Sequence, residues 1–196
     1  MASSTLICGT AVNTAIASNP DWANPGNATA NDGTEAIVSF TGVNQTSDAL
    51  DCDNFGFAIP AGATIDGIVL TVEKRESSTA TNCRDSSIRL FKAGALEGDD
   101  KATATEWPTT LTDVSYGGAA DLWGTTWTVD DINHADFGAR VVAQVVSAGG
   151  SPRVGAVDRV EITVHYTEAA GGDPEGRLVG GKLIRGGLLR GGVLAA

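Results

Sequence analysis

Positively charged residues are scarce in this chain. Its 196 residues contain 13 lysines and arginines against 24 aspartates and glutamates, which gives a net charge of −11. Residues 171–196 hold four of the basic and two of the acidic side chains, so residues 1–170 carry a net charge of −13. Proteins that bind nucleic acid neutralise its phosphates with lysine and arginine. The composition therefore argues against a nucleic-acid partner and favours a soluble, self-repelling body.

Cysteine is also scarce, and no cofactor motif accompanies it. Cys8, Cys52 and Cys83 are odd in number, unlike the even count of most secreted disulfide frameworks. None lies in a Cys-x-x-Cys spacing, which argues against zinc. We predict free, buried thiols, with a Cys52–Cys83 bridge as the alternative if the protein matures outside the cell. Phosphate-binding and dinucleotide-binding fingerprints are missing too, so we predict no cofactor.

Long apolar runs are missing from both ends of the sequence. The first residues lack a basic stretch followed by an apolar core, so we see no secretory signal and expect the protein to be made and assembled in a cytoplasm. The apolar residues near the C-terminus are interrupted by glycines, and the segment is too short to span a bilayer. We therefore expect no membrane partner.

Alternating apolar and polar residues indicate strands, while long helical periodicity is hard to find. The clearest strand is 159–167, where Val160, Ile162, Val164 and Tyr166 face one way. Segments 36–40, 68–74, 87–92 and 139–146 are further strand candidates. Many strands and turns without helices between them predict an all-β protein, an antiparallel β-sandwich of jelly-roll type with an extended C-terminal apolar arm.

The composition divides the chain into four parts. Residues 1–35 are predicted to be an irregular segment packed on the body, and residues 36–168 form the sandwich. Residues 169–176 are a linker rich in glycine with one proline, and residues 177–196 form the arm. A single helical turn is expected near 132–137, capped by Asp130 or Asp131.

The arm repeats a pattern of apolar residues and glycines that cannot form a buried core by itself. Three Gly-Gly pairs separate apolar doublets, and glycine costs a helix about 1 kcal/mol per residue. We predict that the arm docks on another protein, where its apolar doublets add strands to a sheet edge and its basic residues meet acidic groups. Alternatives are a disordered tail without a partner and a helix lying on a membrane surface. The docking residues would be Leu178, Val179, Leu183, Ile184, Arg185, Leu188, Leu189, Arg190, Val193 and Leu194.

Three kinds of chemical site were considered for the body. Trp123 and Trp127 are predicted to seal one end of the sandwich, and the alternative is an exposed platform that stacks on glycans. The oxygen-rich stretch 48–54 is the preferred calcium candidate, although its spacing does not match a calcium-binding loop, so no metal site is predicted. Nothing in the sequence selects a pair of carboxylates for hydrolysis, and we expect no enzymatic activity.

Three segments carry a resemblance to a known group of proteins. They are Phe-Ala-Ile-Pro-Ala-Gly-Ala-Thr-Ile-Asp-Gly-Ile at 57–68, Asp-Leu-Trp-Gly-Thr-Thr-Trp-Thr at 121–128, and Asp-Phe-Gly-Ala-Arg-Val at 136–141. With them, residues 36–168 resemble β-sandwich structural proteins of tailed bacteriophages. Such proteins decorate or cement the capsid, or serve as accessory and fibre components of the tail.

The resemblance implies a role in the virion. Its first reading is a non-enzymatic capsid decoration or cement subunit that binds the assembled particle through the C-terminal arm and stabilises it by mass action. The alternative is a tail fibre or tail accessory adhesin that binds host surface glycan. The implied partners are a major capsid protein or a tail protein, and further copies of the chain, with a trimer as the commonest arrangement.

Overall fold

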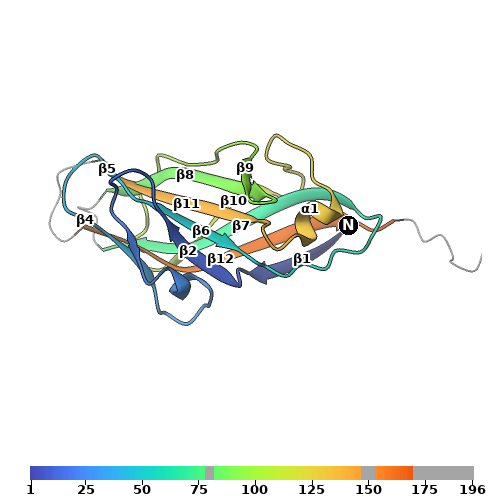
Figure 1. Ribbon diagram of the computed structural model, residues 1–196, viewed down its shortest axis with the longest axis horizontal. Helices are drawn as coiled ribbons and strands as arrows, with labels where there is room; N and C mark the ends of the chain where they lie inside the picture. The colour runs from blue at the N-terminus through green and yellow to red at the C-terminus, as the bar shows by residue number, and fades with distance from the viewer. Residues whose placement is uncertain (78–81, 147–152, 170–196) are drawn as a thin grey trace, which may run out of the picture.

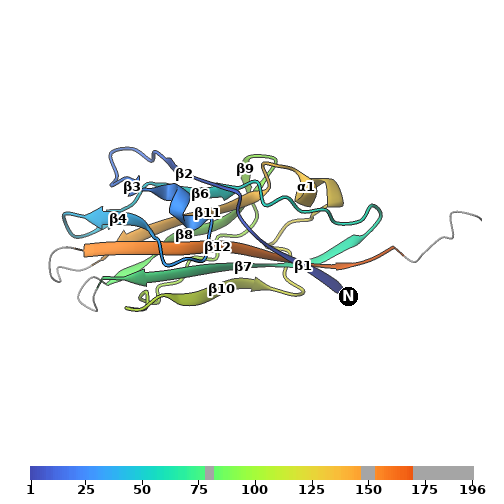
Figure 2. The ribbon, with the colours of Figure 1, turned by 90° about the horizontal axis from the view of Figure 1, so that it is seen from below.

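The computed structural model describes residues 1–77, 82–146 and 153–169, and these ranges form two antiparallel sheets packed face to face (Figures 1 and 2). The predicted arm, and all but residue 169 of the predicted linker, lie outside the described residues. In the first sheet the order is β10-β7-β12-β4-β3, with β1 also paired to β12. In the second it is β2-β6-β11-β8-β9, with β5 also paired to β11. The bounds are β1 Ala2–Ile7, β2 Thr10–Thr14, β3 Trp22–Ala23, β4 Ala36–Phe40, β5 Gln45–Thr46, β6 Ala49–Asp53, β7 Thr64–Glu76, β8 Cys83–Lys92, β9 Ala95–Glu97, β10 Thr112–Gly118, β11 Gly138–Val145 and β12 Arg153–Thr167.

Along the chain, the long strands alternate between the two sheets. β6, β8 and β11 belong to the second sheet, while β7, β10 and β12 belong to the first. Figure 2 shows these layers edge-on, with β7, β12 and β10 on one side and β6, β8 and β11 on the other. The prediction of an all-β, antiparallel sandwich of jelly-roll type is confirmed.

The two longest strands, β7 and β12, build the centre of the first sheet. Their register places Leu70 opposite Ile162 and Val72 opposite Val160, and all four side chains are fully buried. The predicted alternation is confirmed for both strands. Burying each such side chain stabilises the fold by roughly 1.5–3 kcal/mol.

The prediction of an irregular segment at 1–35 is wrong. β1 pairs with β12 along its whole length, from Ala2 opposite Tyr166 to Ile7 opposite Glu161, and β2 pairs with β6. A short 3-10 helix, η1 (Pro25–Ala28), follows β3. The Ser- and Thr-rich strand β1 has only intermediate and exposed side chains, so it lacks the strong apolar alternation that marks a core strand. Edge pairing, which needs backbone groups more than apolar side chains, accounts for its structure.

One end of the sandwich is closed by aromatic rings and by a short helix, α1 (Val129–Asn133). Phe137 makes edge contacts with Phe57 and Trp127, at ring-centroid distances of 5.9 and 5.5 Å. The predicted cap on α1 is corrected. Thr128 is the N-cap and accepts the backbone N–H of Asp131, whose carboxylate accepts the backbone N–H of Thr128 in return. Among the described residues no helix is long and apolar enough to cross a membrane.

All three cysteines fall within the described ranges and carry free, buried thiols. Cys52 and Cys83 are therefore not joined, and the prediction of free thiols is confirmed. The Cys8 thiol donates a hydrogen bond to the Ala28 carbonyl at 3.4 Å, which ties the end of β1 to η1. A hydrogen bond with the Cys8 thiol, followed by burial, raises the pKa of Cys52 well above its ordinary value, so this thiol is a poor nucleophile.

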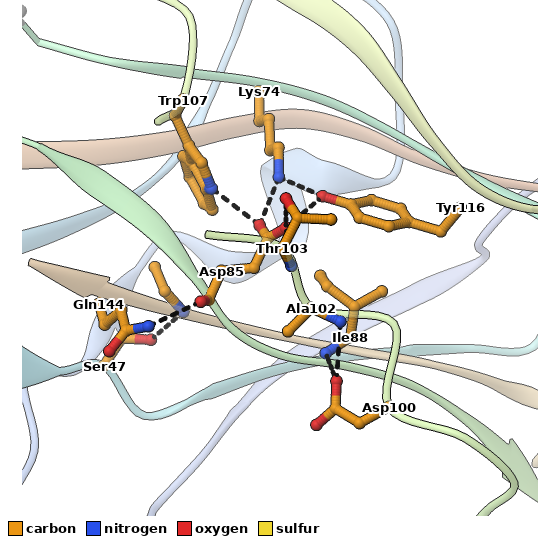
Figure 3. Close-up of polar contacts among 11 residues, drawn as sticks. Ser47, Lys74, Asp85, Ile88, Asp100, Ala102, Thr103, Trp107, Tyr116 and Gln144 are labelled. Atoms are coloured by element: carbon orange, nitrogen blue, oxygen red, sulfur yellow. Dashed lines mark hydrogen bonds and ion pairs between the residues drawn. The ribbon is translucent and has the colours of Figure 1, made fainter. Parts of the chain in front are cut away.

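A group of buried polar side chains interrupts the apolar core between the sheets (Figure 3). Lys74 on β7 and Asp85 on β8 form an ion pair at 2.5 Å, and their side chains are only 2% and 1% exposed. Tyr116 on β10 donates its hydroxyl to Asp85 at 2.8 Å, and the indole of Trp107 donates to the same carboxylate at 2.8 Å. We call these four side chains the buried charge cluster.

Candidate functional site

The two tryptophans considered as a glycan platform lie in the core. Trp123 is fully buried and donates its indole N–H to the Ile68 carbonyl at 3.0 Å. Trp127 is 7% exposed and donates to the Leu122 carbonyl at 3.0 Å. A buried ring offers no free face to a sugar, so the platform hypothesis is wrong for these residues. Their predicted role of sealing one end of the sandwich is confirmed.

The oxygen-rich stretch 48–54 does not gather its carboxylates in one place. Asp48 points inward and accepts hydrogen bonds from the Ile16 backbone N–H at 2.7 Å and from the Asn13 amide at 3.0 Å. Asp51 lies on the outer face of β6, where it pairs with Arg140. Protein donors therefore occupy both carboxylates. Within the described parts of the chain, no group of three or more acidic, His or Cys side chains is arranged to hold a metal ion.

A hollow of about 340 Å³ opens on the outer face of the second sheet, and we call it the outer-sheet hollow. Strands β2, β6, β8 and β11 supply most of its lining, and the Gly94 turn and the loop before β11 supply the rest. It combines an exposed aliphatic side chain with carboxylates and a guanidinium, on elements whose backbone is fixed by the sheet. The lining residues are Val12, Thr14, Asp51, Asp53, Phe91, Gly94, Asp136 and Arg140.

The Arg140 guanidinium forms a flat polar surface in this hollow. Its Nε and Nη2 atoms donate to the two oxygens of Asp51 at 2.7 and 2.6 Å, which is a bidentate pair. The guanidinium also lies over the Phe91 ring, 5.4 Å from the ring centroid. The hydrogen bonds to Asp51 raise the pKa of Arg140 above its ordinary value, so the group stays charged. Two neighbouring strands and an aromatic ring therefore hold one planar donor in a fixed orientation.

A glycine on β11 allows the strands beneath the hollow to lie this close. Gly138 pairs with Phe91 on one side, and a Cβ atom added to it would lie only 2.1 Å from the Cys52 carbonyl oxygen on β6. No other residue type fits there without separating the strands. On the outer face of the second sheet, no side chain therefore stands between Asp53 and Phe91, beside the Arg140 guanidinium.

The hollow is rimmed by negative charge. Partial burial and the nearby carboxylates of Asp136 and Asp51 raise the pKa of Asp53, although a hydrogen bond from Thr10 opposes the shift. Asp136 itself is well exposed, at 60% of its side chain. An anionic ligand would be repelled here, whereas a neutral polar ligand would meet hydrogen-bond acceptors on the rim and donors in the floor.

Two other hollows offer less for recognition. One of about 440 Å³ lies at the α1 end, beside the edge of Trp127, and is lined mainly by small residues of the 61–65 and 127–130 segments. One of about 390 Å³ lies against β3 and β4 and includes Ser18, Asp21 and Gln45. Neither contains a paired, oriented charge comparable to Arg140 and Asp51.

Sequence reasoning did not find the outer-sheet hollow. Asp51 attracted attention only as a calcium candidate, and Arg140 only as part of a strand. The available signal was weak: each residue is a charged position within a mostly apolar strand. Their pairing depends on the register of β6 against β11, which places Asp51 directly opposite Arg140, 89 positions later in the sequence.

Comparisons with known proteins add a likeness of fold. The sequence matches no family model and no curated protein. Among solved structures, a xylan-binding module, CBM15, is 13% identical, with 86% of this chain and 99% of that chain covered and a TM-score of 0.41. The CBM36-1 domain of a multidomain xylanase from the hindgut metagenome of Trinervitermes trinervoides is 10% identical, with 87% and 99% covered and a TM-score of 0.30. Likeness at this level transfers no function to the chain.

Proposed function

We propose that the protein is a non-catalytic glycan-binding module and that the outer-sheet hollow is its sugar site. The observation that supports this proposal is the flat, oriented pair of Arg140 and Asp51 in the floor of an accessible hollow. The proposed ligand class is a neutral glycan, in which hydroxyl groups and small apolar C–H faces alternate around each ring.

Sugar hydroxyls require fixed donors and acceptors close together, because each hydroxyl both donates and accepts. Arg140 supplies the N–H groups that it does not donate to Asp51, and the carboxylate of Asp53 supplies acceptors on the neighbouring strand. Val12, which is 44% exposed, provides an apolar contact for the C–H face of a ring. Since the strands hold these groups in place, little ordering entropy is lost when a ligand binds.

The surrounding charge supports a neutral ligand over an acidic one. Asp53 and Asp136 lie at the rim, and residues 1–170 carry a net charge of −13. Like charges within a few ångströms repel, and the remaining acidic surface adds a long-range barrier at low salt. Sulfated and uronic-acid glycans should therefore bind more weakly than neutral ones.

Arg140→Lys should weaken binding of the preferred neutral glycan by roughly 10- to 100-fold, because a hydrogen bond from a charged group contributes about 1.5–3 kcal/mol. Lysine keeps the charge but loses the planar, bidentate donor. A glycan array on the full-length protein would identify the ligand, and calorimetric titration of the variant would measure the change. Arg159→Lys is the matched control, since Arg159 pairs with Asp113 at 2.6 Å on the opposite sheet.

Equal losses in the two variants would contradict the assignment of the hollow. An array on which the folded wild-type protein binds no glycan would contradict the function itself. Release of reducing sugar from a bound glycan would contradict only the non-catalytic part of the proposal.

A virion setting is the second element of the proposal, and the sequence of residues 177–196 supports it. The three Gly-Gly pairs and the apolar doublets between them favour docking on a partner, and the basic residues suit an acidic surface. In this setting the sandwich would be displayed on a phage particle, as a tail accessory adhesin or as a capsid decoration subunit. Its partners would be a tail or major capsid protein and further copies of itself, with a trimer expected.

Deleting residues 177–196 should abolish binding to the assembled particle while the sandwich stays folded. Co-sedimentation of truncated and full-length protein with purified particles measures this, and circular dichroism checks the fold. If the truncated protein occupies particles normally, the arm does not anchor it. Glycan binding by the truncated protein should be unchanged. The sugar site in the sandwich and the anchoring role of the arm are therefore tested independently.

A further inference from the structure

We propose that Lys74 and Asp85 become joined by an amide bond between Nζ and Cγ, which covalently links the two sheets. This inference does not depend on the proposed function. It rests on the buried charge cluster, where an amine and a carboxyl group are held against each other out of reach of water. Figure 3 shows Lys74, Tyr116 and Trp107 converging on Asp85 from three directions.

The contact already brings the two reacting groups together. Lys74 Nζ lies 2.5 Å from Asp85 Oδ1, so the amine and the carboxyl group are in direct contact. The amine is flanked by the rings of Trp107 and Tyr116, with centroids at 4.5 and 5.1 Å. Fixed proximity of this kind replaces a bimolecular encounter, and it can be equivalent to an effective concentration of roughly 10⁵ M or more.

The surroundings favour the reactive form of the amine. Burial lowers the pKa of Lys74, against the opposing attraction of Asp85. In a medium with few water molecules, transfer of a proton from the ammonium to Asp85 Oδ2, through the Tyr116 hydroxyl that contacts both groups, removes two buried charges at once. The products of this transfer are a neutral amine, which is a nucleophile, and a carboxylic acid, which is an acceptor for it.

The carboxyl group is surrounded by donors placed to stabilise a developing negative charge. Oδ1 accepts the Trp107 indole N–H at 2.8 Å, and Oδ2 accepts the Tyr116 hydroxyl at 2.8 Å and the Thr103 hydroxyl at 3.2 Å. Burial, followed by the charge of Asp85, raises the pKa of Tyr116 well above its ordinary range, so the phenol keeps its proton. These donors act on Asp85 as an oxyanion hole acts on an acyl group.

The reaction then balances without any further reagent. The Nζ lone pair attacks Cγ, and the oxygen that becomes O⁻ stays hydrogen-bonded to Trp107. Tyr116 contacts both Nζ and Oδ2, so it can give its proton to Oδ2 and take one from Nζ. Cγ–Oδ2 cleavage releases water, and the sum is one ammonium and one carboxylate converted to one amide and one water. Loss of the water from a closed, largely apolar core opposes hydrolysis.

The mass of the purified, denatured full-length protein tests this proposal. The expected mass is lower than the sequence mass by that of one water. Trypsin should release residues 85–89 joined to residues 1–75, because no lysine or arginine precedes Lys74 and the amide blocks cleavage after it. A full-length protein with the unreduced sequence mass would overturn the proposal. So would a water loss mapped elsewhere, for instance at Asp32-Gly33 or Asp66-Gly67, where aspartate can cyclise.

Variants separate the chemistry from the fold. Lys74→Met should restore the mass expected for its sequence, whereas Lys101→Met, which removes a half-buried lysine paired with Asp121 at 2.8 Å, should keep the water loss. Tyr116→Phe keeps the amine and the carboxyl but removes the proton relay, so a larger unlinked fraction is expected. An unchanged linked fraction in Tyr116→Phe would overturn the assigned relay, and water loss in Lys74→Met would overturn the link.

Discussion

Replacing Asp85 by alanine should lower the free energy of unfolding by about 3–5 kcal/mol, because it leaves the buried Lys74 ammonium without a counter-charge. The same change removes the acceptor of the Trp107 indole and of the Tyr116 hydroxyl, both inside the core. An unsatisfied buried donor costs about 1–3 kcal/mol. Since most domains are stable by only about 5–15 kcal/mol, a large part of the total would be lost.

Chemical denaturation followed by tryptophan fluorescence would measure this loss. Glu106→Ala is the matched control, because Glu106 pairs with Arg84 at 3.0 Å but its side chain is 44% exposed. An exposed pair of this kind contributes about 0–1 kcal/mol. The double change Lys74→Met with Asp85→Leu should recover part of the loss, since it removes both charges, but Trp107 and Tyr116 still lose their acceptor.

A loss below about 1 kcal/mol in Asp85→Ala, comparable to that in Glu106→Ala, would show that the pair is not held in a dry core. The proposed amide bond would increase the loss, because a cross-link also restricts the unfolded chain. Mass spectrometry of the wild-type protein shows, before any variant is made, whether the stability comes from the buried ion pair alone or also from the amide cross-link.

The long central strands β7 and β12 could be predicted from the sequence, and edge strands such as β1 and β10 could not. β7 and β12 alternate apolar and polar residues over many positions, which reflects one buried and one exposed face. β1 and β10 are rich in Ser, Thr and Gly and expose much of their surface, so their pattern resembles that of a loop. Their strand character comes from pairing with β12 and β7, which no local pattern records.

The only sign of the buried charge cluster in the sequence is that Lys74 falls on the core-facing positions of an alternating strand. Lys74 continues the spacing of Ile68, Leu70 and Val72, so a strict alternation places it in the core. A lysine at such a position contradicts the usual preference of lysine for an exposed site, so the predicted strand over 68–74 did not by itself identify it as buried. Knowing that Lys74 is buried would have required its partner Asp85, which lies on the opposite sheet.

The proposed sugar site depends even more on tertiary structure. Arg140, Asp51 and Phe91 come from three strands, and only the register of the second sheet brings them together. Sequence reasoning therefore turned to tryptophan, the side chain most often used to stack on sugars. In this protein the residues considered for that role are used for packing instead.

Trp123→Ala should lower the free energy of unfolding by about 3–5 kcal/mol, the usual cost of deleting a large buried ring. Trp123 is fully buried, and its indole lies so close to β10 that a Cβ atom added to Gly117 would be 2.6 Å from Nε1. The neighbouring chain is thus shaped around this ring and cannot easily collapse into the space it would leave. Denaturant unfolding of the variant and the wild type measures the difference.

Trp123→Phe is the informative comparison, because it keeps an aromatic body but removes the hydrogen bond to the Ile68 carbonyl. It should cost less than the alanine variant, and glycan binding by the folded fraction of either variant should match that of the wild type. A Trp123→Ala protein with unchanged stability and lost glycan binding would contradict both the core position of the indole and the assignment of the sugar site to Arg140. A stability loss with binding retained separates the residues that hold the sandwich together from those that face its ligand.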